Sequence, residues 1–477
     1  MNLNYNSDMR TTIQRYILVV VMAFAAASVL TAQELRSAYF TDDYKFRHDM
    51  NPAYGNQQNY IAIPVIGNFN VSTQGNFGLR DVLFQNPQTG KYDLTFMHPS
   101  ISTDEALKGF STGMNRVQAN VAMPIISFGF KGMGGYNTFE VNSKTTVDVA
   151  LPYDLLAFAK NMGNQSYSFD DFGARGQSYV EIALGHSRDI NKQLRVGAKL
   201  KALLGVARAD LEVKGMTANL TGNTWTLTSG ETKGQVNMKG LTFKNTTDKN
   251  YKDGRPDVHV DFGETDVDGS GVSGFGLGVD LGAVYEVMEG LKVSAALNDL
   301  GFISWSKTQL LTPKSKQFTF NGFHDISVKD TDNDPNSLEN QSDRYVDQLS
   351  DFINLKNEGE QGSRSTMLAA TAIVGGEYQL PVYKPLSFGL LAMHRFNGDY
   401  SWDEARLSAN WTPLKWLDGG VNLAVNTFTA SAGWVLNVHP KGFNVFFGMD
   451  HILGKQSKDG IPLSSNSSVN LGMAVTF

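Results

Sequence analysis

Two histidine-containing stretches are the closest that this sequence comes to a catalytic centre. Asp257-Val-His259 pairs a carboxylate with an imidazole, as outer-membrane proteases do, and His186-Ser187 sets a base beside a hydroxyl near the end of an expected strand. An adjacent pair is a poor start for an esterase triad. The chain has no Gly-rich phosphate loop and no HExxH motif, and eight histidines among 477 residues produce such pairs by chance. We therefore expect no catalytic residue and no enzyme.

Two acidic stretches are spaced partly like calcium loops. The stretch 330–334 has aspartates at alternate positions, but Pro335 and Gln341 stand where an EF-type loop needs Gly and Glu. The stretch 266–271 has the glycine, but Leu277 occupies the position of the bidentate ligand. Neither stretch is complete, so the sequence predicts no metal site and no cofactor.

The composition restricts the kinds of protein that remain. The absence of cysteine excludes thiol nucleophiles, Cys-ligated metals, disulfides and a lipoprotein anchor. The formal charge is −6; the segments 253–268 and 324–361 carry −5 and −7, so the rest of the chain is net positive. These acidic segments are typical of solvated loops, and neither resembles a nucleic-acid footprint. We expect no nucleic-acid partner.

The N-terminus has the pattern of an export signal. Arg10 and Arg15 precede the apolar run Ile17–Leu30, and the small residues Thr31-Ala32 follow it. The alternative is a membrane anchor, but the run is shorter than the roughly 20 residues that a spanning helix needs. We assign residues 1–32 to a cleaved signal peptide. The mature chain is then either a soluble secreted protein or an outer-membrane β-barrel.

Strict alternation favours the barrel. At the C-terminus every second residue is large and apolar, and the residues between them are small or polar; the apolar set is Val469, Leu471, Met473, Val475 and Phe477. Such a period places one set toward lipid and the other toward a lumen. The same pattern recurs in other segments, whereas a soluble β-sandwich array would not need polar residues to share one face in so many strands. A strand ending in an aromatic residue also resembles the signal that barrel-assembly machinery recognises.

Fourteen segments are expected to be strands, which predicts an all-β, transmembrane antiparallel barrel in residues 60–477. The segments are 60–75, 116–130, 136–149, 178–190, 194–208, 275–287, 291–305, 365–380, 386–396, 402–411, 418–427, 429–438, 443–453 and 467–477. Short turns fall on one side, and the loops 76–115, 150–177, 209–274 and 306–364 fall on the other, as in outer-membrane barrels. A sixteen-strand barrel is the alternative if Thr224–Phe243 is a further hairpin; we expect that hairpin to extend above the membrane. Trp411 and Trp416 flank a short turn, where an aromatic girdle is expected.

The segment 33–59 is too polar for a strand and too aromatic for a disordered tail. Its Asn51-Pro52-Ala53 turn resembles the motif of FadL-like outer-membrane transporters of hydrophobic molecules. With the tyrosine-rich leader and the stretch Asn298–Trp305, the match is nearest to an uncharacterised exported barrel family of unknown function within that group. The resemblance implies an N-terminal hatch folded inside the barrel. A fourteen-strand barrel leaves an aqueous lumen unless something fills it, and we expect Tyr39, Phe40, Tyr44 and Phe46 to fill this one.

The resemblance further implies transport, since a hatch in a barrel makes a plugged channel. We expect a monomer in the outer membrane of a Gram-negative bacterium that passes small, hydrophobic molecules. Its other expected partners are outer-membrane lipid, lipopolysaccharide and the barrel-assembly machinery. The alternative is a scaffold without transport activity, a subunit of a secretion or attachment assembly whose long loops bind protein partners. The sequence names neither a substrate nor a partner.

Overall fold

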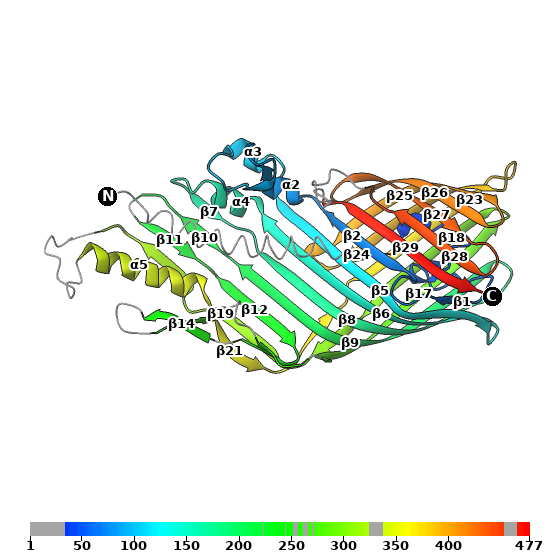
Figure 1. The fold of residues 1–477 in the computed structure, drawn as a ribbon, viewed down its shortest axis with the longest axis horizontal. Helices are drawn as coiled ribbons and strands as arrows, with labels where there is room; N and C mark the ends of the chain where they lie inside the picture. Colours follow the sequence, from blue (N-terminus) through cyan, green and yellow to red (C-terminus); the bar gives the residue numbers. More distant parts are fainter. Residues whose placement is uncertain are drawn as a thin grey trace.

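The computed structural model describes residues 34–222, 224–243, 245–250, 256–260, 266–269, 271–323, 337–452 and 465–477. The signal peptide predicted for residues 1–32 lies outside the described residues. Fourteen antiparallel strands, two of them interrupted, close into a β-barrel, which confirms the predicted fold (Figure 1). We call each of these fourteen strands a wall of the barrel. The walls are β1 (Tyr60–Ala62) continued by β2 (Phe69–Gly75), β5 (Met114–Gly132), β6 (Gly135–Pro152), β8 (Phe172–Asp189), β9 (Leu194–Lys214), β17 (Gly274–Met288), β18 (Leu291–Trp305), β22 (Arg364–Met367) continued by β23 (Ala370–Gln379), β24 (Leu386–Phe396), β25 (Trp402–Leu414), β26 (Leu417–Asn426), β27 (Ala430–Val438), β28 (Phe443–Met449) and β29 (Ser467–Thr476).

The first wall closes the ring. Tyr60 of β1 lies opposite Thr476 of β29 on one side and Gly129 of β5 on the other. β2 continues the same two pairings nearer the long loops. Because each wall has a neighbour on both sides, the ring leaves no strand edge unpaired, as a bilayer requires.

Two of the predicted strands are interrupted. The segment 60–75 breaks between β1 and β2, where Val65 has a φ of 71° and Pro64 has no N–H to donate. The backbone N–H of Val65 still donates to the carbonyl of Pro124 at 2.8 Å, so the break stays attached to β5. The segment 365–380 divides into β22 and β23, and Leu368 between them donates to the Gly301 carbonyl at 2.9 Å.

The exterior of the ring is apolar. In β29, from Val469 to Thr476, the odd-numbered residues are half-buried or exposed and the even-numbered ones are buried, as the alternation predicts. Leu277, Val374 and Leu423 on other walls are 64%, 61% and 66% exposed. An apolar belt of this kind is typical of the lipid-facing surface of a membrane barrel. The helices in the described part of the chain are too short or too polar to cross a membrane.

One side of the barrel continues beyond the ring. The outer part of β9 pairs with β12 (Glu231–Met238), β12 with β19 (Thr308–Pro313), and β19 with β21 (Leu355–Gln361). Beyond them β7 (Ser166–Ser168), β10 (Thr217–Asn219), β11 (Trp225–Thr228) and β20 (Gln317–Phe320) form a separate sheet, which packs against α5 (Leu338–Ile353). Figure 1 shows this extension to the left of the ring.

The predicted hairpin over Thr224–Phe243 is wrong. β11 pairs with β10, and β12 pairs with β9, so the turn of the hairpin lies between β10 and β11 and its first arm is the end of β9. The error arose because β9 is 21 residues long and continues past the bilayer. No part of β12 joins the closed ring, so the sixteen-strand alternative does not hold.

The remaining elements are short. They are η1 (Arg36–Ala38), η2 (Arg47–Asp49), α2 (Leu79–Val82), β3 (Leu83–Gln85), β4 (Tyr92–Thr95), α3 (Thr103–Leu107), α4 (Tyr153–Lys160), β13 (Leu241–Thr242), β14 (Asn245–Asn250), β15 (Pro256–Val260), β16 (Asp266–Val267) and η3 (Gly398–Tyr400). α2, α3 and α4 share a buried core with the outer ends of β5 and β6. They cover that rim of the barrel and give the loops a core of their own.

Candidate functional site

The N-terminal segment, residues 34–59, occupies the interior of the ring. Its side chains contact β6, β9, β18, β25 and β28, which lie on different sides of the barrel. In Figure 1 its dark-blue trace lies within the ring. The aromatic residues expected to fill the lumen are all buried; they are Tyr39, Phe40, Tyr44 and Phe46. Whether this filling closes a channel remains a prediction.

Aromatic side chains of the N-terminal segment pack edge-on against aromatic side chains of the barrel strands. The ring of Tyr44 lies edge-on to Phe446 of β28, with centroids 4.8 Å apart, and Phe46 packs against Tyr60 at 5.4 Å. The hydroxyl of Tyr39 lies 2.9 Å from the hydroxyl of Ser294 on β18. Burial raises the pKa of the Tyr39 hydroxyl, so this group stays protonated and can donate a hydrogen bond.

The Asn51-Pro52-Ala53 turn is held by the asparagine side chain. Its Oδ1 accepts a hydrogen bond from the backbone N–H of Ala53 at 3.0 Å, which fixes the turn locally. Its Nδ2 is 3.4 Å and 3.3 Å from the carbonyls of Ala283 on β17 and Ala295 on β18. Asn51 is fully buried, and it joins the turn to two neighbouring walls.

A pair of glycines makes room for this turn. Gly197 of β9 and Gly282 of β17 lie directly opposite each other in the sheet. A Cβ on Gly197 would collide with the carbonyl of Pro52, and one on Gly282 would collide with the Asn51 side chain. The two glycines therefore form a notch in the inner face of the wall, in which the turn sits.

The two motifs that carry the family resemblance meet at this place. Asn298, the first residue of the Asn298–Trp305 stretch, donates from Nδ2 to the carbonyl of Met50 at 2.8 Å. Asp299 beside it has a φ of 58°, and its carboxylate pairs with Lys201 at 2.6 Å. The sequence singled out both motifs, but only the fold shows that Asn298 binds the backbone directly before the Asn51-Pro52-Ala53 turn.

A lysine on β9 joins two carboxylates from different elements. Lys199 Nζ lies 2.6 Å from Asp49 in η2 and 2.6 Å from Glu140 on β6. His48 completes the group, with its Nε2 2.9 Å from Glu140. All four side chains are buried or nearly so. The lumen-facing lysine thus neutralises a carboxylate of the wall and one of the segment.

A second charged group anchors the start of the segment. Arg36 donates from Nη1 to Glu404 on β25 at 2.5 Å, and the backbone N–H groups of Arg36 and Ser37 donate to Asp450 at 3.0 Å and 2.6 Å. Arg406 lies 2.8 Å from Glu404 and completes the group. Arg36 escaped the sequence analysis because its partners lie more than 360 residues away.

The basic residues of the segment behave differently from one another. His48 pairs with Glu140 on β6. Lys45 instead donates to Gln58 at 3.3 Å, and Arg47 donates to Asp42 at 2.6 Å, both within the segment. Burial lowers the pKa of Lys45 below its ordinary value. The segment therefore carries part of its own charge compensation into the barrel.

The remaining predicted site residues lie on the outside of the barrel. Trp411 and Trp416 are 52% and 46% exposed at the short-turn end, and Trp411 donates from Nε1 to the Tyr383 hydroxyl at 3.2 Å. Phe477 is 67% exposed beside β1. Their roles as girdle and assembly signal stay predictions. The apolar residues predicted for the assembly strand are Val469, Leu471, Met473 and Val475 of β29, with Phe477 directly after it.

The candidate catalytic residues His186 and Ser187 have separate partners in the described part of the chain. His186 pairs through Nδ1 with Asn137 at 2.9 Å, whereas Ser187 accepts from Arg195 at 3.0 Å. His259 lies on β15, and the side chain of Asp257 lies outside the described residues, as does the stretch 330–334. Leu277, next to the other acidic stretch, is an outward-facing residue of β17.

Comparison with known proteins gives a family and several similar folds. The toluene transporter TbuX of Ralstonia pickettii has 8% identity and a TM-score of 0.38, with 94% of each chain covered. The toluene transporter TodX of Pseudomonas putida has 8% identity and a TM-score of 0.39, with 94% and 95% covered. A FadL homologue of Pseudomonas aeruginosa has 9% identity and a TM-score of 0.31, with 89% and 90% covered. No curated protein matches the chain. Residues 52–450 match a family of unknown function, DUF5723, and the chain belongs to that family.

Proposed function

We propose that this protein is an outer-membrane channel for small molecules, closed by its own N-terminal segment. The observation that carries the proposal is the notch of Gly197 and Gly282, which receives the Asn51-Pro52-Ala53 turn. In this barrel the inner face is shaped to receive a separate segment, whereas in a barrel without such a segment the side chains of the strands themselves would have to fill the lumen. The segment is held by noncovalent contacts only, since the chain has no cysteine, and noncovalent contacts are reversible.

The class of molecule follows from the surfaces of the segment and the barrel. Tyr39, Phe40, Tyr44 and Phe46 give the segment an aromatic surface, and displacing it would expose that surface together with Phe446. Aromatic faces favour apolar or aromatic solutes over ions. Small hydrophobic molecules are therefore the proposed substrate class, in agreement with the expectation from the sequence.

Deleting residues 34–56 tests the plug directly. The deletion keeps β1 and every other wall, so the purified barrel should still show heat-modifiable migration on SDS gels. In planar bilayers its conductance should rise well above that of the full chain, because a fourteen-strand ring without a filling leaves an aqueous lumen. A folded deletion variant with unchanged conductance would count against a plug.

A second candidate function is a scaffold, which the extension of the barrel favours. β12, β19, β21 and α5 stand beyond the ring and present a large folded surface that a simple pore does not need. Crosslinking in intact cells followed by purification from membranes separates the two candidates. A stoichiometric protein partner bound to residues 209–274 or 306–364 favours the scaffold, and a chain recovered alone favours the channel.

A further inference from the structure

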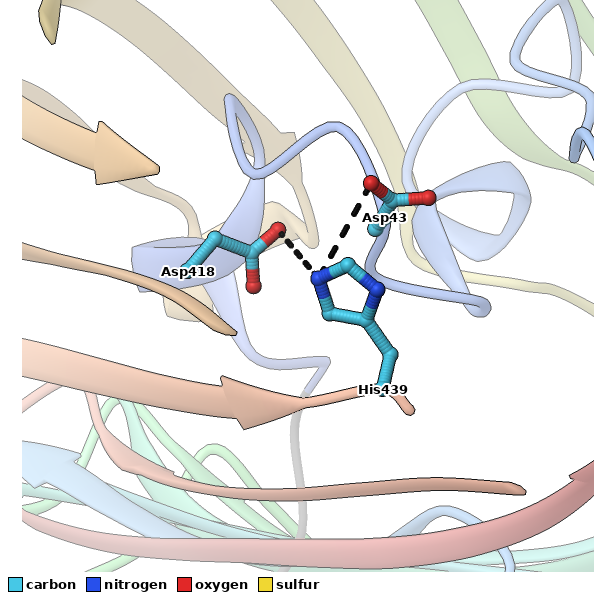
Figure 2. Close-up of side chains that lie close together, drawn as sticks. All are labelled: Asp43, Asp418 and His439. Carbon is cyan, nitrogen blue, oxygen red and sulfur yellow. Dashed lines mark ion pairs between the residues drawn. The ribbon is translucent and has the colours of Figure 1, made fainter. Parts of the chain in front are cut away.

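Three side chains far apart in the sequence meet at the short-turn end of the barrel. They are Asp43 of the N-terminal segment, Asp418 of β26 and His439, which directly follows β27 (Figure 2). His439 Nε2 lies 3.5 Å from Asp418 Oδ2 and 3.8 Å from Asp43 Oδ2. Figure 2 shows both carboxylates directed toward the same imidazole nitrogen.

The polar atoms of this cluster lack ordinary partners. Asp418 is 2% exposed and His439 is 8% exposed. Among the described residues, neither oxygen of Asp418 nor Nε2 of His439 has a hydrogen-bond partner. A buried carboxylate without a hydrogen bond is costly, and a bound cation would relieve that cost.

Lys45 supplies only part of the missing positive charge. Lys45 Nζ lies 3.8 Å from the other carboxylate oxygen of Asp43, and it donates its hydrogen bond to Gln58. Two carboxylates with one ammonium leave a net charge of about −1 in a largely buried place. The oxygens that face His439 therefore remain open to a second cation.

A second cluster of the same residue types shows the contrast. His48, Asp49 and Glu140 also lie within metal-ligand range of one another. There Lys199 lies 2.6 Å from each carboxylate, and His48 bonds Glu140 at 2.9 Å. In that cluster a lysine already fills the position that a metal would take.

We propose that Asp43, Asp418 and His439 bind a divalent transition-metal ion, with zinc as the reference ion, and so tie the N-terminal segment to the barrel wall. Ligand atoms about 2.1 Å from a tetrahedral zinc ion lie about 3.4 Å from one another. The 3.5 Å and 3.8 Å separations need little closure to reach that spacing. An imidazole with two carboxylates suits zinc and its neighbours better than calcium or magnesium. The fourth position is left to water.

A cavity lined mainly by acidic side chains adjoins the proposed metal site. Asp418 lines a cavity of about 240 Å³ at the same end of the barrel. Acidic side chains outnumber basic ones in its lining; the acids are Asp42, Glu286, Glu289, Glu377 and Asp418, and the bases are Lys292 and Lys384. Such a lining concentrates cations near the ligands.

Metal binding to the full chain in detergent tests the proposal. After removal of metal with a chelator, the protein should take up one equivalent of Zn²⁺, and excess Ca²⁺ should not displace it. Co²⁺ should give the visible absorption of a low-symmetry N/O site. Asp418→Asn and His439→Gln should each weaken Zn²⁺ binding at least about tenfold. His394→Gln is the matched control, because His394 pairs with Asp403 at an exposed place away from the cluster.

Two further variants show whether the ion bridges segment and wall. Asp43→Asn changes a residue that is 36% exposed and outside the barrel strands, so it should fold even if Asp418→Asn does not. It should weaken Zn²⁺ binding, as should the deletion of residues 34–56. Zn²⁺ should also raise the temperature of the heat-modifiable transition in the full chain and in His394→Gln, but not in Asp43→Asn.

The results that overturn the proposal are distinct from those that bear on transport. If His394→Gln loses as much Zn²⁺ as His439→Gln, or if the full chain binds less than one equivalent, the site is not a metal site. If Asp43→Asn and the deletion both keep full affinity, the ion does not bridge. Conductance plays no part in these measurements, so the metal site stands or falls independently of the channel.

Discussion

At the scale of single residues, Gly197 on β9 matters because it has no side chain. Gly197→Ala adds one methyl group, which would collide with the Pro52 carbonyl, so the Asn51-Pro52-Ala53 turn must leave the notch. We expect higher basal conductance in planar bilayers and faster proteolysis of the N-terminal segment, with a ring that still folds. Gly376→Ala on β23 is the control, because a Cβ there meets nothing within 4 Å. Equal behaviour of the two variants would show that the notch does not seat the segment.

Lys199 offers a second test at this scale. Lys199→Met leaves the carboxylates of Asp49 and Glu140 buried without their shared cation, and such a loss typically costs about 3–5 kcal/mol. We expect the free energy of unfolding in detergent, measured with urea, to fall by about that amount. Adding Asp49→Asn and Glu140→Gln to Lys199→Met should recover most of the loss, since no unpaired charge then remains. A triple variant as unstable as the single one would assign the loss to packing.

At the scale of elements, local patterning explains which predictions were correct. A strand that separates lipid from lumen alternates, so the segment ending at Phe477 could be recognised from a few residues. The break at Val65 and the division between β22 and β23 escaped, because each depends on hydrogen bonds to neighbouring walls. The pairing of β9 with β12 escaped because β9 continues past the bilayer, where lipid no longer enforces alternation.

The candidate site was harder to predict than the strands. The sequence marked the Asn51-Pro52-Ala53 turn as special, but it could not say which residues of the barrel interior surround that turn. Contacts such as Arg36 with Glu404 or Asp43 with His439 join residues separated by more than 360 positions. Contacts between residues so far apart produce no periodic pattern in the sequence. A carboxylate without a hydrogen-bond partner among the described residues, such as that of Asp418, can be recognised only when its surroundings are known.

At the scale of the whole molecule, closure depends on the C-terminal strand, which pairs with β28 on one side and with β1 and β2 on the other. Two roles of its last residue are separable there. The backbone of Phe477 exchanges hydrogen bonds with Asn59, each at 3.1 Å, and these bonds do not need the ring. Phe477 as a whole is 67% exposed, so its side chain contributes little to packing within the chain. A residue with this geometry is suited to recognition by another protein.

Phe477→Ala therefore should affect assembly in the cell more than stability. Refolded in detergent, the variant should show the same heat-modifiable migration and the same urea midpoint as the unaltered chain, because the Asn59 hydrogen bonds remain. In cells it should reach the outer membrane more slowly and accumulate unfolded in the periplasm, as pulse-chase labelling with unheated gels would measure. Val475→Ala is the matched control on the same outward face, with a side chain that is 50% exposed. A delay of equal size in both variants would mean that the strand needs outward apolar surface in general, and that the terminal aromatic residue carries no separate signal.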